Sequence, residues 1–481
     1  MAESEFKLGQ RVHSAGDPRR IGTVAYVGPV QGYSGVWIGV DWDNGDGKHD
    51  GSINGVRYFH AKSERSSSFV RAHNLSSGIS LLEALRLRYQ GDTTKEEEDE
   101  MYVLSASNKR VSVELVGKDK IQDKLSRFEE LTGASLSFLG VSSPGSSPCD
   151  IGTVLPNLKE LDLTGNLLSD WKVEVLKYSL PAIEELHLMG NNISTIDPPS
   201  FLTVHGFDSL RLLNLEDNCI ADWIEILKLS QLRSLEQLHL NKNILNRIFY
   251  PDNDMIGELS IASELHEKSD EPFQNMRCLL LGSNNLQDPA SIDALNSFPK
   301  LVDIRLSDNP ILNIPRFVLI ARLEKVEILN GSEVSIRERK ESEIRYVRLV
   351  MSKLQGNLED IRQLHPRFAE LKKIHGIDDE KPSTGVAGPQ KMASGLLSIT
   401  LKCVGASIGE RSPLTKKLPA TTTVGKLKIL CESFFKLKSI KLKLFLQEEG
   451  SPLPIMLDDE MASLMDVGVG NDSTILVDEE S

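Results

Sequence analysis

A nine-residue pattern of leucine and asparagine recurs six times in the middle of this 481-residue chain. The segments read LKELDLTGN, IEELHLMGN, LRLLNLEDN, LEQLHLNKN, MRCLLLGSN and LVDIRLSDN, and they begin at Leu158, Ile183, Leu210, Leu235, Met276 and Leu301. Most starts lie 25 to 27 residues apart, which suits one strand and one return segment per turn of a solenoid. The pattern therefore predicts a stack of repeats.

This pattern is the signature of the leucine-rich repeat family. The two leucines of each L-x-L pair are expected to point from a short parallel strand into a shared core. The asparagines are expected to bond the backbone of the neighbouring turn in a ladder, so we assign them no site role; they are Asn166, Asn191, Asn218, Asn243, Asn284 and Asn309.

One interval is longer than the others. From Leu235 to Met276 the spacing is 41 residues, and the excess lies within 248–273. Insertions in solenoids commonly form loops on one face, often the binding face. A longer helix on the convex side explains the same excess, and the sequence leaves both interpretations open.

The segments after the repeats change in character. Residues 326–347 resemble the cap that closes leucine-rich repeats, and a helix is expected from about Ser335 to His375, with Pro366 as its possible break. Residues 376–395 have the Gly, Pro and Ser content of a flexible linker. From Leu396 the order β-β-α-β-β resembles a ubiquitin-like domain. Since the chain ends VDEES without a diglycine, this domain is expected to dock partners without being conjugated.

The segment between Gly78 and Leu155 is harder to interpret. We expect a helix at 79–90, a hairpin around Asn108 and a helix at 121–131 that forms an N-terminal lid on the repeats. Residues 142–149, SSPGSSPC, suggest a flexible spacer.

Four glycines, a lysine and a histidine stand within Gly45–Phe59, GDGKHDGSINGVRYF. A phosphate-binding P-loop would need a glycine at Trp42 and a Ser or Thr at His49, so a nucleotide site is excluded. Short Val, Ile and aromatic runs separated by Gly, Pro and Asp instead predict a small all-β barrel over 8–70.

This region resembles the CAP-Gly family. The matching segments are Gly22 with Val24, 35–40, the loop 47–51, Gly55, Tyr58-Phe59 and Phe69-Val70. Three positions depart from the family pattern: His49 replaces an asparagine, Ala61 a cysteine and Ser68 a glycine.

The composition of the loop indicates capture of a terminal carboxylate. Glycine N–H groups could encircle the carboxylate and Lys48 would supply a cation beside it. An apolar slot is expected from Trp37, Trp42 and Phe69, and His49 could donate a hydrogen bond. The predicted site is Trp37, Trp42, Gly47, Lys48, His49, Asp50, Gly51 and Phe69. The alternative places Trp37 in the barrel core and Trp42 at the surface. The resemblance implies an acidic tail ending in an aromatic residue, as on α-tubulin.

Composition excludes several other functions. The net charge of −14 disfavours nucleic acid. The five scattered cysteines include no CxxC pair and no recognisable nucleophile motif, so we expect no disulfide framework, zinc site or enzymatic activity. No secretory signal is expected from MAESEFKLGQ, and we expect no cofactor.

Together, the predicted fold class is a CAP-Gly barrel, an α/β leucine-rich repeat solenoid and a β-grasp ubiquitin-like domain. This order resembles the tubulin-folding cofactor E family. The resemblance implies a cytoplasmic, cytoskeleton-associated chaperone that binds α-tubulin and works with cofactors D, C and B and a small GTPase. Contact with the ubiquitin or proteasome machinery is implied for the last domain. The alternative is a microtubule-associated CAP-Gly adaptor. The expected segments are 1–77, 78–150, 151–347, 348–395 and 396–481.

Overall fold

A computed structural model describes most of the chain. The described residues are 6–90, 102–104, 110–112, 125–145, 148–171, 180–196, 207–230, 232–250, 272–353, 363–377, 396–405, 411–437, 441–447, 454–457, 460–464 and 467–479. They fall into two compact units, one comprising Met1–Asn246 with Pro251–Asn285 and the other Arg247–Tyr250 with Leu286–Ser481. The long interval at 248–273 and the linker at 376–395 lie almost wholly outside the described residues.

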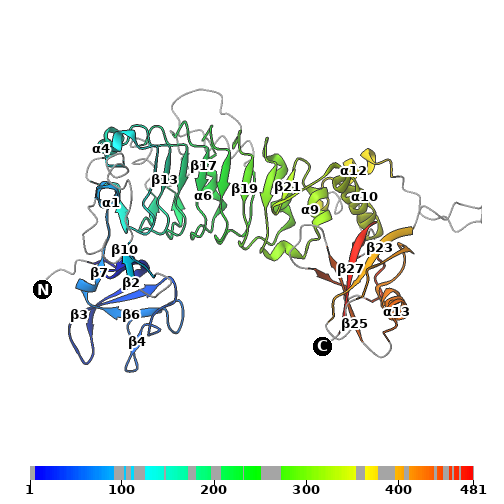
Figure 1. Ribbon diagram of the computed structural model, residues 1–481, viewed down its shortest axis with the longest axis horizontal. Helices are drawn as coiled ribbons and strands as arrows, with labels where there is room; N and C mark the ends of the chain where they lie inside the picture. Colours follow the sequence, from blue (N-terminus) through cyan, green and yellow to red (C-terminus); the bar gives the residue numbers. More distant parts are fainter. Residues whose placement is uncertain are drawn as a thin grey trace, which may run out of the picture. The chain divides into compact units, whose positions relative to one another are not determined.

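The first unit begins with the predicted barrel (Figure 1). Its strands are β1 (Arg11–Ser14), β2 (Asp17–Val30), β3 (Tyr33–Trp42), β6 (Ser67–Val70) and β7 (Leu75–Ser76), paired in the order β6-β3-β2-β1-β7. A second ribbon joins β4 (Ser52–Ile53) to β5 (Val56–Arg57). The core packs Val12, Val24, Ile38, Val40 and Trp42 together, because alternate residues of each strand face inward.

Short elements connect the barrel to the repeats. The predicted hairpin is confirmed as β9 (Tyr102–Leu104) paired with β10 (Arg110–Ser112). The helix expected at 79–90 begins later, as α1 (Leu81–Tyr89), because Ser80 and Glu83 form a capping box. The described part of the helix expected at 121–131 is helical only at Leu125, and a 3-10 turn spans Phe128–Glu130. The flexible spacer is also wrong at both ends, since β12 covers Val141–Ser143 and α4 covers Pro148–Val154.

The repeats of the first unit form a parallel sheet. Strands β13 (Glu160–Asp162), β15 (Glu185–His187), β17 (Leu212–Asn214), β18 (Gln237–His239) and β19 (Cys278–Leu280) pair in chain order, with Leu161, Leu186, Leu213, Leu238 and Leu279 in register. These leucines are fully buried. The helix α6 (Trp223–Leu227) and the small pair β14 (Asp170–Trp171) and β16 (Thr195–Ile196) belong to the return segments. The solenoid prediction is confirmed.

The asparagine ladder is also confirmed. Asn218 donates from Nδ2 to the carbonyls of Leu188 and Leu215, each 3.0 Å away, and so joins two repeats. The residue before each ladder asparagine has a positive φ, and these residues are Gly165, Gly190, Asp217, Lys242, Ser283 and Asp308.

An additional degenerate repeat precedes the six. Strand β11 (Gly133–Ser135) pairs in parallel with β13, and Ala134 lies opposite Leu161. Phe138 takes the left-handed conformation with φ 57°, as the equivalent residues of the other repeats do. Sequence analysis missed this repeat because Ala134 and Leu139 stand where the pattern has leucine and asparagine.

The second unit contains the end of the repeats and their cap. Strand β20 (Asp303–Arg305) pairs with β21 (Ile328–Leu329), which turns back as β22 (Ser332–Glu333). The helical elements are α8 (Pro289–Ala294), η3 (Leu295–Ser297), η4 (Pro310–Asn313), α9 (Arg316–Arg322), α10 (Ile336–Lys353) and α12 (Phe368–Ile374). The expected helix from Ser335 is thus confirmed in α10, and a separate helix follows Pro366.

A ubiquitin-like β-grasp fold completes the second unit. Its sheet has the order β24-β23-β27-β25-β26, with β23 (Leu396–Cys403) and β27 (Ser473–Glu479) parallel at the centre. The other strands are β24 (Leu414–Pro419), β25 (Leu442–Gln447) and β26 (Ile455–Met456), and the helix is α13 (Val424–Phe435). Cys403 and Cys431 are free and buried within this fold. None of the described helices is both long and apolar enough to span a membrane.

Candidate peptide-binding surface of the barrel

The glycine-rich loop after β3 is fixed to the strand β6. The N–H groups of Gly47 and Lys48 donate to the carbonyls of Arg65 and Ser67, at 2.6 and 2.7 Å. His49 exchanges two backbone hydrogen bonds with Ser67, at 2.9 and 3.0 Å. These three N–H groups are therefore engaged inside the barrel, and the expectation that glycine N–H groups encircle a ligand carboxylate is wrong for Gly47.

Close packing explains the glycine at position 47. A Cβ placed on Gly47 would lie 2.3 Å from the backbone nitrogen of Ser67 and 2.4 Å from the carbonyl carbon of Ser66. Backbone atoms cannot move away as a flexible side chain can. Gly47 thus lets the loop lie directly on the chain entering β6, which presents Lys48 and His49 beside that strand.

Asp50 acts as a structural anchor of the loop. Its carboxylate accepts hydrogen bonds from the hydroxyl and N–H of Ser52 and, at 2.7 Å, from the guanidinium of Arg57. The hydrogen bonds from Ser52, followed by those from Arg57, hold the pKa of Asp50 well below its usual range. Because both carboxylate oxygens of Asp50 already accept hydrogen bonds, Asp50 shapes the loop and its carboxylate is not available to a peptide.

An aromatic cluster lies next to the loop, centred on Phe69. The ring centroid of Phe69 lies 5.4 Å from that of Tyr58, 5.5 Å from Phe59, 6.0 Å from His49 and 6.1 Å from Tyr26. Phe69 and Tyr26 both pair with Gly39 of β3, and directly opposed strand residues share a face. Gly39 leaves the room that these rings fill, since a Cβ there would lie 2.3 Å from Phe59 Cε1.

The two tryptophans of the predicted slot lie on opposite faces of β3. Trp42 is 1% exposed and belongs to the barrel core, beneath the guanidinium of Arg20. Trp37 is half-buried on the outer face, where it contacts Tyr33 and Arg71. Residues five apart on one strand must face opposite sides. The slot expected from Trp37, Trp42 and Phe69 therefore cannot include Trp42, and the alternative that placed Trp37 in the core and Trp42 at the surface is reversed.

The cation of the predicted site is exposed. Lys48 forms no ion pair with any residue that the structure describes, whereas the nearby Arg57 is paired with Asp50 at 2.7 Å. The surface thus combines an available ammonium group with half-buried rings. Tyr26 and Tyr58 belong to it although sequence analysis did not select them. Tyr58 stands in the Tyr58-Phe59 motif, which was a usable signal, whereas the place of Tyr26 depends on its pairing with Gly39 in the sheet.

The strand face of the repeats offers a second surface in the first unit. Charges of alternating sign pair along consecutive strands, Lys159 with Glu184 at 2.7 Å and Arg211 with Glu236 at 3.0 Å. His187, Asn214, His239 and Leu280 follow one another in register on this face. The same face brings together Glu160, Glu185 and His187, whose ligand atoms are close enough to share a metal ion. Exposed acidic clusters like this one are common in proteins that bind no metal.

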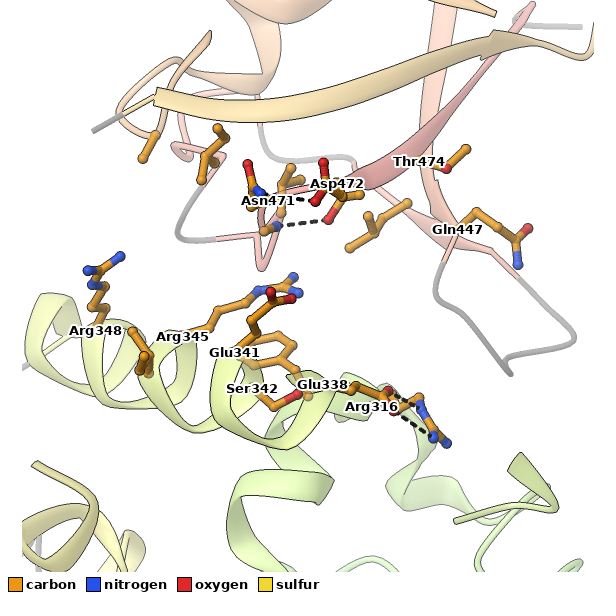
Figure 2. A pocket seen from close by; sticks show the side chains of 18 residues that line it. Arg316, Glu338, Glu341, Ser342, Arg345, Arg348, Gln447, Asn471, Asp472 and Thr474 are labelled. Carbon is orange, nitrogen blue, oxygen red and sulfur yellow. Dashed lines mark hydrogen bonds and ion pairs between the residues drawn. The ribbon is translucent and has the colours of Figure 1, made fainter. Parts of the chain in front are cut away.

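A cavity of about 650 Å³ lies in the second unit (Figure 2). Arg345, Arg348 and Glu341 line it from α10, and Asn471, Asp472 and Thr474 line it from the ubiquitin-like fold. Some of its charges are paired within the protein, since Arg316 pairs with Glu338 at 2.8 Å and Asp472 with Arg337 at 3.1 Å.

Comparison with known proteins supports the assignment of the first unit. The CAP-Gly domain family matches residues 8–75, and the leucine rich repeat family matches residues 156–220. The chain is 59% identical to tubulin-folding cofactor E of Arabidopsis thaliana, over 100% of this chain and 99% of that protein. The chain belongs to the tubulin-folding cofactor E family.

More distant members of the cofactor E family also match along the whole chain. Tubulin-specific chaperone E of Danio rerio is 30% identical and that of Homo sapiens 25%, each with 98% of both chains covered. The C-terminal ubiquitin-like domain of mouse tubulin-specific chaperone e, known in solution, has 30% identity, covers 20% of this chain and 96% of that chain, and has a TM-score of 0.17. These relatives are named as chaperones and none of them as an enzyme.

Proposed function

We propose that this protein is a non-enzymatic tubulin-folding cofactor that binds α-tubulin through two surfaces. The barrel (1–77) would capture the acidic tail with its terminal aromatic residue, and the repeats (151–347) would hold the globular body. The ubiquitin-like domain (396–481) would dock another cofactor or the degradation machinery. The 59% identity to a tubulin-folding cofactor over the full length carries this proposal.

The chemistry of the barrel surface supports the tail as its ligand. The exposed ammonium of Lys48 suits a carboxylate, and the half-buried rings of Tyr26, Tyr58 and Phe69 suit an aromatic side chain. His49 lies beside Phe69, and Trp37 stands two residues before Gly39 on the same face of β3. In this proposal Gly47, Asp50 and Gly51 shape the loop without touching the tail.

The proposed role in the cell is assembly and dissociation of the αβ-tubulin heterodimer in the cytoplasm, together with cofactors D, C and B and a small GTPase. The alternative function, a microtubule adaptor without folding activity, would use the same barrel surface. Incubation with purified heterodimer separates the two, because a cofactor is expected to dissociate it and an adaptor to leave it intact.

The test of tail capture measures binding to αβ-tubulin with and without the aromatic residue that ends the α tail. Lys48→Ala is the informative variant, and Lys7→Ala is the matched control at another exposed lysine of the first unit. We expect both tail removal and Lys48→Ala to weaken binding, with Lys7→Ala unchanged. Unaltered binding by Lys48→Ala would remove the barrel loop from the site.

A further inference from the structure

The barrel is joined to the repeats by a very short connection. Strand β7 pairs with β1 inside the barrel, while β8 (Ile79–Ser80) pairs with β12 beside the first repeats. Only Ser77 and Gly78 separate β7 from β8. The N–H of Ile79 donates to the carbonyl of Gly140 at 2.9 Å, so the chain is held on the repeat side as soon as it leaves the barrel.

A direct contact reinforces the connection. Gly140 has φ 73°, and a Cβ on it would lie 2.6 Å from Nε2 of His13. His13 belongs to β1 and is only 8% exposed. The backbone at Gly140 therefore lies against the barrel so closely that no side chain fits between them.

Phe138 forms a second bridge. Its ring covers Gly165 of the first regular repeat so closely that a Cβ there would lie 2.1 Å from Phe138 Cε1. The guanidinium of Arg19, on β2, lies 5.7 Å from the centre of the same ring, within the range of a cation–π interaction. One aromatic side chain thus contacts both the barrel and the repeats.

These contacts involve β1, β2 and β7 of the barrel and neither β3 nor β6. His13 and β7 lie at the β1–β7 edge of the sheet, whereas Phe69 lies on β6 at the opposite edge. The junction consequently leaves the aromatic cluster and Lys48 accessible.

We infer that this junction is a fixed joint, which holds the peptide-binding surface of the barrel and the strand face of the repeats in one set relation for a single tubulin dimer. The inference rests on the proposed function and adds to it that the two tubulin-binding surfaces are held at a fixed orientation. Two linked sites gain affinity only if both can engage at once, and a rigid joint of matching geometry avoids the ordering cost of a flexible one.

The experiment uses the full chain with a flexible Gly-Ser segment inserted between Ser77 and Gly78, combined with Arg19→Ala. A matched control carries the same segment after Gly376, which is exposed and lies in the second unit. Binding is measured to intact αβ-tubulin and to a synthetic α-tail peptide, and ¹⁵N relaxation reports the tumbling of the barrel.

We expect the junction variant to bind the peptide as the parent does and to bind intact tubulin about tenfold or more weaker, because a flexible joint must be ordered on binding whereas a fixed one is ordered beforehand. Its barrel should tumble faster than the repeats, whereas the barrel and the repeats of the parent and control should tumble together. Equal affinity of parent and junction variant for intact tubulin would overturn the fixed joint while leaving tail capture intact. Independent tumbling in the parent would overturn it without reference to tubulin. Absence of peptide binding in the parent would instead overturn the tail capture on which the inference rests.

Discussion

The side-chain oxygen of Asn191 accepts a hydrogen bond from the backbone N–H of Asn166, 3.1 Å away in the preceding repeat. Asn191 also donates to the carbonyls of Leu163 and Leu188, both at 3.0 Å, and is fully buried. One amide group thereby satisfies backbone groups of two turns.

Asn191→Ala should therefore destabilise the first unit substantially. Each buried polar group left without a partner costs about 1–3 kcal/mol, so we expect a loss of about 3 kcal/mol or more in the free energy of unfolding, measured by urea titration. The exposed Asn246 provides the matched control, and Asn246→Ala should change stability by less than about 0.5 kcal/mol. Equal effects of the two substitutions would contradict a structural ladder.

Gly47→Ala should unfold the loop or the whole barrel. The added methyl group meets backbone atoms at 2.3 and 2.4 Å, and overpacking of this kind costs about 1–3 kcal/mol or more. Thermal unfolding followed by tryptophan fluorescence measures the loss. Gly16→Ala is the control, because a Cβ at Gly16 meets nothing within 4 Å. Equal stability of the two variants would contradict the close packing of Gly47 against Ser66 and Ser67.

The two tryptophans of β3 should respond differently to truncation. Trp42→Ala removes a side chain that is 1% exposed from the core, so the barrel should lose about 3–5 kcal/mol of stability. Trp37→Ala removes a half-buried ring and should cost less, while weakening binding of a tail peptide. Calorimetry together with peptide titration distinguishes the roles, and a larger stability loss for Trp37→Ala would contradict them.

Asp50 should remain ionised in the folded barrel under mildly acidic conditions. Its pKa is lowered by hydrogen bonds from Ser52 and Arg57, compared with about 3.9 in an unfolded chain. Its stabilising contribution is thus complete above about pH 4 and is lost as the pH falls toward the folded-state pKa. Carboxyl NMR titration should give a higher pKa in Arg57→Ala than in the parent, and an unchanged value would remove the role of Arg57.

Cys431 should resist alkylation until the ubiquitin-like fold opens. Burial, with a smaller influence from Cys403, raises the pKa of the Cys431 thiol to about 12, whereas an unfolded cysteine titrates near 8.5. The thiol therefore favours the folded state below about pH 8.5, and this contribution is lost as the pH rises toward 12. Iodoacetamide at pH 8 with mass spectrometry checks the first statement. Unfolding at alkaline pH should be less pH-dependent in Cys431→Ala.

The repeats were predictable because each one carries the leucine and asparagine pattern that specifies its strand and turn. Leu161 or an equivalent apolar residue and Asn166 recur in each of the six regular repeats, and a stack of similar turns can satisfy them in only one way. The degenerate repeat escaped detection because Ala134 replaces the leucine of the pattern and Leu139 replaces its asparagine.

The barrel surface was predictable only in part. The family motif located the loop and Lys48, but the partners of the loop N–H groups, Arg65 and Ser67, depend on contacts between distant strands. The opposite facing of Trp37 and Trp42 could have been deduced from the two-residue period of a strand. The place of Tyr26 depends on a register that the sequence alone does not state.

The degenerate repeat also has a consequence for self-association. A parallel sheet ends in a strand whose outward N–H and carbonyl groups can template the strand of another molecule. Here the last strand on that side is the three-residue β11, and the N–H of Ser135 donates to the hydroxyl of Tyr89 from α1 at 2.9 Å. A short edge that is already bonded to its own helix discourages head-to-tail stacking of copies, so a chain built from stackable turns is protected at this end from growing into a fibre.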